Sequence, residues 1–144
     1  RIAFYTSINT TVAPRFRING FYNATTTGIP VYLPSEITLI KAEALTRGGN
    51  LSSALTELNK VVTKTAAADP FRVGANLAAS TAATSEDLLN EIYKIRCIEL
   101  FMSGLKLEDM RRFGRANTER KRNFFPYPFK ERDGNSNTPA DPTF

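Results

Sequence analysis

The group best placed to do chemistry in this chain is a carboxylate, Glu99, that lies among apolar residues. At about 100° per helical residue, it falls in the middle of the apolar stripe formed by Leu88, Ile92, Ile95 and Met102. A buried carboxylate is costly unless it is paired. Arg96 lies one turn earlier, and Arg111 and Arg112 follow on a second predicted helix. We therefore predict an ionic latch between Glu99 and these arginines; the alternative is that Glu99 reaches solvent at the rim of the core.

The composition offers little for catalysis. The sequence has no histidine, which removes the commonest general base and the usual zinc ligands. Its single cysteine, Cys97, lacks the adjacent base or helix N-terminus that activates a nucleophilic thiol. Glu108 and Asp109 are neighbours on a helix, so they point about 100° apart and do not face one substrate. We expect a protein that is not an enzyme and that has no metal site and no cofactor.

The net charge of +5 is concentrated in one segment. The basic residues of that segment are Arg111, Arg112, Arg115, Arg120, Lys121 and Arg122. Such a cluster, with phenylalanines nearby, could bind nucleic acid phosphates and bases, and binding would then fall steeply with salt. It could equally be a solvated helix end, where cations offset the helix dipole. No nucleic-acid motif accompanies the cluster, so we favour the second interpretation and expect no nucleic acid partner.

Four helices are expected between residues 34 and 114. They are Ser35–Arg47 with Ser35 as N-cap, Leu51–Lys64, a long helix from a Thr84 cap to about Ser103, and Leu105–Phe113. The Gly48-Gly49 turn would join the first two into an antiparallel hairpin. The sequence thus predicts a mainly α fold of helical hairpins with long irregular loops.

Less regular segments flank the helices. Residues 1–33 are expected to form a loop and extended segment before the first helix, with a short strand near 15–19. Residues 66–84 are expected to form a long loop with one weak helical turn. The segment 115–144 contains several prolines and predicts an extended tail. We expect one domain over residues 1–144, which starts at Arg1 and is expected to be a trimmed piece. No signal peptide is visible, and no run of 18 uncharged apolar residues is present.

Three blocks, taken in order, resemble the C-terminal part of the SusD/RagB family. Leu33-Pro-Ser-Glu36 with Leu39-Ile-Lys-Ala-Glu-Ala44 is similar to the first conserved helix of that family. Residues 95–112, with Arg96, Glu99-Leu100, Gly104 and Asp109-Met110, are similar to its later helix pair. Phe125-Pro-Tyr-Pro128, with Glu131 and Asn135, is similar to its closing segment. Together the blocks span residues 33–137.

The resemblance implies a SusD-like fold with tetratricopeptide-like hairpins. It also implies a cell-surface lipoprotein of Bacteroidetes that binds oligosaccharide or another nutrient. Such proteins work with a TonB-dependent, SusC-like transporter on the extracellular face of the outer membrane, and a lipid anchor would lie in an N-terminal segment outside this chain. The chain itself would be mostly the helical scaffold that docks on the transporter.

A sugar site in such a protein would use exposed aromatic rings together with polar side chains. The candidate residues are Arg17, Tyr22, Asn23 and Tyr32, all in the expected loops. The competing interpretation is that these aromatic rings pack on the helices. A helical-hairpin scaffold that binds only protein, without a ligand site of its own, is the alternative function.

Overall fold

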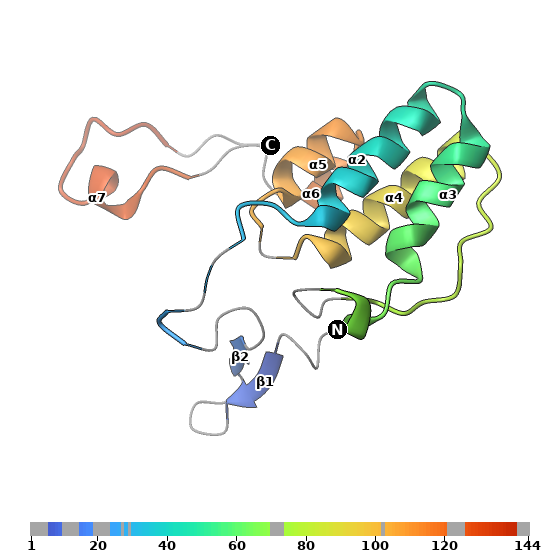
Figure 1. The fold of residues 1–144 in the computed structure, drawn as a ribbon. Helices are drawn as coiled ribbons and strands as arrows, with labels where there is room; N and C mark the ends of the chain where they lie inside the picture. The colour runs from blue at the N-terminus through green and yellow to red at the C-terminus, as the bar shows by residue number, and fades with distance from the viewer. Residues whose placement is uncertain are drawn as a thin grey trace. The chain divides into compact units, whose positions relative to one another are not determined.

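The computed structural model describes residues 6–9, 15–18, 24–26, 28, 30–69, 74–101, 103–120 and 126–140. The chain divides into two compact units, Arg1–Met102 and Ser103–Phe144. Helices make up most of the regular structure in the described residues (Figure 1), which confirms the prediction of a mainly α fold. No helix of the described residues is both long and apolar enough to cross a membrane.

The first unit is built on an antiparallel pair, α2 (Pro34–Arg47) and α3 (Leu51–Val62). Gly49 has φ +80°, the left-handed conformation that glycine adopts without steric cost, and it closes the tight turn expected from the sequence. Leu39 of α2 and Leu58 of α3 are fully buried. Buried alanines at 42 and 54 leave room for close approach of helices, so the predicted hairpin is confirmed.

Ser35 is not the N-cap that the sequence predicted. Leu33 holds that position in an extended conformation, and the helix begins at Pro34. Proline suits the first helical position because its φ is already helical and it has no N–H to leave unpaired. Ser35 therefore lies inside the first turn, and its buried side chain is available for a contact outside the helix.

The helix α4 (Ser85–Glu99) packs against both helices of the hairpin (Figure 1). Thr84 caps it: its hydroxyl oxygen accepts from the backbone N–H of Asp87 at 3.1 Å and its hydroxyl donates to the Asp87 carboxylate at 2.7 Å. The predicted Thr84 cap is thus confirmed, although the Asp87 carboxylate accepts from the Thr84 hydroxyl and not from the backbone N–H that a capping box uses. The helix ends earlier than expected, because Leu100 leaves the helical conformation at φ −100° and ψ 27°.

Residues 63–84 connect α3 to α4. Among the described residues of this connection, a 3₁₀ turn, η1 (Ala66–Ala68), agrees with the weak turn expected there. From Gly74 to Ala83 the chain runs beside α3 without a turn or bend (Figure 1). The backbone N–H groups of Asn76 and Leu77 donate to the carbonyls of Lys64 and Val62 at 2.9 and 3.0 Å. These bonds attach the start of the straight segment to the end of α3.

Near the N-terminus, β1 (Thr6–Asn9) pairs with β2 (Arg15–Ile18) as an antiparallel hairpin. Ser7 lies opposite Arg17 in the register. The short strand expected near residues 15–19 is therefore confirmed.

The second unit contains α5 (Lys106–Arg112), α6 (Asn117–Arg120) and α7 (Phe129–Arg132). The helices α6 and α7 lie in a segment that was expected to be extended. Prolines restrict only the residues before and at their own positions, and α7 begins directly after Pro128. The expectation was wrong for these two single turns.

Candidate functional site

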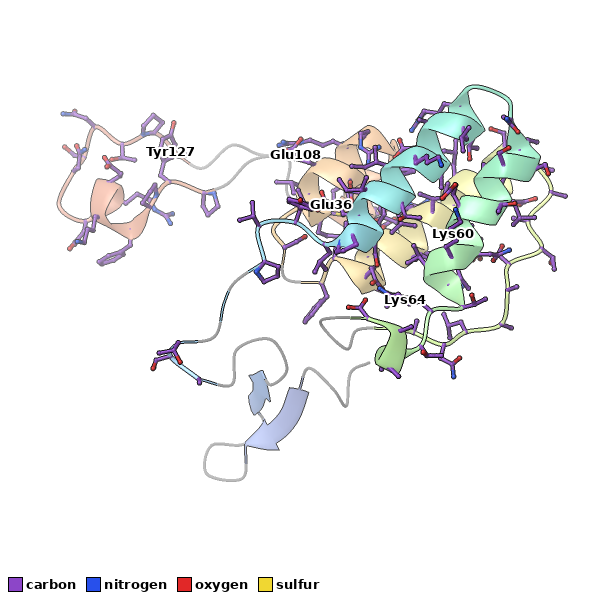
Figure 2. All side chains as sticks on the ribbon, in the orientation of Figure 1. Glu36, Lys60, Lys64, Glu108 and Tyr127 are labelled. Carbon is purple, nitrogen blue, oxygen red and sulfur yellow. The ribbon has the colours of Figure 1, made fainter. Side chains whose placement is uncertain are left out.

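An ionic cluster surrounds the ammonium group of Lys64, directly beyond the end of α3 (Figure 2). Its Nζ donates to Glu99 Oε1 at 2.6 Å, to Ser35 Oγ at 2.5 Å and to Asp69 Oδ2. The partners come from the last residue of α4, the first turn of α2 and the residue after η1. One side chain therefore connects four segments of the first unit.

The charged side chains of this cluster are largely buried, which indicates a structural role. The Glu99 and Asp69 side chains are 1% and 5% exposed, and Lys64 is 15% exposed. Arg96, one turn before Glu99, is also buried. Charged groups in such surroundings are stable only when they contact one another. No group of three or more potential metal ligands occurs among the described residues. The cluster is thus suited to hold helices together.

Glu99 is buried, as its place in the apolar stripe predicts, but sequence reasoning missed Lys64 as its partner. Lys64 lies 35 residues earlier, and no periodic pattern connects the two positions. Arg111 and Arg112 belong to the second unit, where they pair with Glu108 and Asp109. The latch between Glu99 and those two arginines stays a prediction.

The arginines of the basic segment that the structure describes have partners within the second unit. Arg112 contacts the Asp109 carboxylate at 2.8 Å, and its guanidinium lies 4.7 Å from the ring centre of Phe113. Arg115 pairs with Glu119 at 2.7 Å. These contacts favour the interpretation of the segment as a helix surface with paired charges.

The proposed ligand residues have different places in the structure. Arg17 lies on β2. Tyr22 and Asn23 lie outside the described residues. Tyr32, just before α2, is 64% exposed, so its ring does not pack into the helical core.

An apolar strip of α2 is also exposed. Ile37 and Ile40 are about half exposed, and Val31, just before the helix, is almost fully exposed. Together with Tyr32 these residues form what we call the α2 strip. Single exposed apolar residues are common on proteins, but Ile37 and Ile40 are three residues apart on α2 and therefore neighbours on one face of the helix.

On the helical hairpin, the largely buried Glu57 of α3 bridges two exposed lysines. Its Oε1 accepts from Lys41 at 2.7 Å and from Lys60 at 2.9 Å (Lys60 is labelled in Figure 2). These two hydrogen bonds hold the pKa of Glu57 below its ordinary value, although partial burial acts in the opposite direction. The bridge to Lys41 connects α3 to α2 through an ion pair at the surface.

Comparison with known proteins adds one match. The model of the SusD family, SusD_RagB, matches residues 17–141, which is most of the chain and covers the greater part of each compact unit. No curated protein and no solved structure matches the chain. The match covers all three sequence blocks described above and every helix in the described residues. This chain belongs to the SusD family.

Proposed function

We propose that this chain is part of a non-enzymatic nutrient-binding subunit of a SusCD-type outer-membrane uptake system. The observation that carries the proposal is the family match over residues 17–141, since the family is one of nutrient-binding proteins. The absence of histidine from the sequence agrees with binding rather than catalysis. The subunit would act on the extracellular face of the outer membrane of a Bacteroidetes cell, held by a lipid anchor outside this chain.

Within that subunit, we assign residues 1–144 to one helical domain that acts mainly as the scaffold for docking on a TonB-dependent, SusC-like transporter. The buried core of the first unit and the Lys64 cluster provide a rigid support for such a role. The α2 strip offers apolar surface of the kind that protein interfaces bury.

The nutrient would be an oligosaccharide or a similar ligand. Tyr32 supports this part of the proposal, because an exposed ring can stack on the apolar face of a sugar. Arg17, Tyr22 and Asn23 would supply hydrogen bonds and further ring contacts. These four residues are the proposed ligand site.

Isothermal titration against a panel of oligosaccharides tests ligand binding. We expect heat with at least one glycan, and loss of that heat in Tyr32→Ala. Tyr127→Ala is the matched control, since Tyr127 is a less exposed tyrosine of the other unit (Figure 2). Equal loss in both variants, or no effect of Tyr32→Ala, would reject Tyr32 as a ligand residue.

The alternative is a helical-hairpin scaffold that binds protein and has no ligand site of its own. The exposed Ile37 and Ile40 favour it, because they provide an interface without a sugar-binding ring. A purified transporter barrel in detergent distinguishes the two functions. Capture of the barrel without heat from any glycan supports the scaffold, whereas capture together with glycan heat supports the nutrient-binding subunit. Ile40→Ser should weaken capture under both functions.

A further inference from the structure

Beyond the two backbone hydrogen bonds at its start, the straight segment beside α3 is held by the side chain of Asn59. Asn59 of α3 contacts both backbone groups of Ser80: its Oδ1 accepts from the Ser80 N–H at 2.7 Å, and its Nδ2 donates to the Ser80 carbonyl at 3.1 Å. The N–H and C=O of one residue point to the same side only in an extended chain, and successive residues alternate in direction. Ser80 therefore directs its backbone groups toward α3, as one residue of a strand would toward its neighbour.

The neighbouring residues must then direct their backbone groups away from α3. Within the part of the chain that the structure describes, the backbone groups of Ala79, Thr81 and Ala83 form no hydrogen bond. All three residues are exposed. They form a free strand edge, which we call the 79–83 edge. Such an edge is a template for pairing with another extended chain.

A groove follows this edge. It has a volume of about 610 Å³ and lies between residues 78–83 and the first turns of α4. The α4 side is lined by Asp87, Asn90 and Glu91. The edge side is lined by small residues, so a second backbone can come close. The volume lies within the range of binding pockets in proteins.

The charge of the residues that line the groove indicates which kind of partner it can bind. The charged residues that line it are Asp87 and Glu91, one helical turn apart, and both are acidic. The chain as a whole is basic, so this surface differs in sign from the average charge of the protein. A partner with lysine or arginine side chains would gain from both carboxylates, whereas an acidic partner would be repelled.

We propose that the 79–83 edge and the α4 wall form a docking groove for an extended, lysine- or arginine-bearing segment of a partner protein. The segment adds as a strand along the 79–83 edge, and alternate side chains reach Asp87 and Glu91. This interaction is independent of nutrient binding at the proposed ligand site, and it survives if that site is rejected.

Fluorescence anisotropy with short labelled peptides of alternating lysine and valine tests the proposal on the full chain. We expect saturable binding that weakens as salt is raised, and much weaker binding of the matched glutamate–valine peptide. The same lysine peptide with alternate backbone amides N-methylated should lose at least about tenfold in affinity, since its ladder hydrogen bonds are removed.

Two pairs of variants separate strand addition from simple charge attraction. Thr81→Pro removes an N–H of the free edge and should raise the dissociation constant of the lysine peptide at least about tenfold. Its control, Thr81→Ala, keeps the N–H of residue 81 and shows how much of the change comes from loss of the side chain alone. Glu91→Gln should weaken binding, whereas Glu86→Gln, outside the groove, should not. Circular dichroism confirms that each variant is folded.

Several results would overturn the proposal. No binding of the lysine peptide would do so, and so would equal binding of the glutamate peptide. Full affinity of the N-methylated peptide would reduce the interaction to ion pairing and reject strand addition. Self-association of the chain that Thr81→Pro abolishes, seen by sedimentation, would assign the edge to a second copy instead.

Discussion

The ammonium of Lys64 lies 2.6 Å from the carboxylate of Glu99 and joins the end of α3 to the end of α4. The two residues are 35 positions apart, and Glu99 is almost completely buried. The same ammonium contacts Ser35 and Asp69, so four segments depend on one cation. The following predictions test this cluster and the packing around it.

Replacing Lys64 by methionine should destabilise the fold strongly. The change keeps an aliphatic chain but leaves Glu99 and Asp69 buried without their shared cation. Removing one partner of a buried ion pair costs about 3–5 kcal/mol. The free energy of unfolding from urea titration measures the loss. Lys94→Met is the control, since Lys94 is 63% exposed and makes a loose contact with Glu91, so its loss should be below about 1 kcal/mol. Equal stability of the two variants would contradict a central role for Lys64.

A double-mutant cycle with Lys64→Met and Glu99→Gln isolates the pair itself. Because both groups belong to one cluster, their effects should not be additive, with a coupling of about 0.5–3 kcal/mol. Additive losses would mean that the two side chains stabilise the fold separately.

Gly74→Ala should destabilise the connection between α3 and α4. A Cβ at residue 74 would overlap the backbone of Thr65, so the backbone has to move. Forced overpacking typically costs about 1–3 kcal/mol. Gly28→Ala is the matched control, because a Cβ there meets no atom within 4 Å. Thermal unfolding of the two variants measures the difference, and a Gly74→Ala protein as stable as the control would contradict the close approach.

Truncation of the core at Leu58 should cost more than truncation of a surface leucine. Leu58 is fully buried in the hairpin, and Leu→Ala in a core costs about 2–5 kcal/mol. Leu77 is 46% exposed, so Leu77→Ala should have a much smaller effect. Urea titration of both variants tests the expected order, and the reverse order would place the core elsewhere.

The Glu57 bridge should make stability depend on acid pH. Hydrogen bonds from Lys41 and Lys60 lower the pKa of Glu57 below 4.5 in the folded protein. A carboxyl whose pKa is lowered by folding stabilises the protein above its unfolded pKa and loses that effect as pH falls through the folded pKa. The stability difference between the unaltered chain and Glu57→Gln should therefore be largest near neutral pH and shrink below about pH 4.5.

Urea titrations across this pH range measure that difference. Glu86→Gln is the control, since Glu86 is exposed on the first turn of α4. A difference that stays constant from neutral to acid pH would mean that the lysine bridges do not stabilise the folded protein.

Much of the local structure followed from the sequence. The apolar stripe of residues 51–62 predicted α3, the Thr84 motif predicted the start of α4, and the Gly48-Gly49 pair predicted the turn at Gly49. These features depend on neighbouring residues only, through helical periodicity, capping hydrogen bonds and the conformational freedom of glycine. The three sequence blocks also indicated the SusD family, and the family match confirms that prediction.

The partners of the buried charges were decided by the tertiary structure. Sequence reasoning put Glu99 in the core and looked for its cation on the same helix and the next one, and the structure adds Lys64 from just beyond the end of α3. It also assigned Ser35 to a cap, whereas the folded chain directs that hydroxyl to the same lysine. The two hydrogen bonds between the Asn59 side chain and the backbone of Ser80 had no sequence signal either. A pattern along one helix fixes which face is buried, but the contact of two distant side chains depends on how the helices pack, and that is set by the whole core.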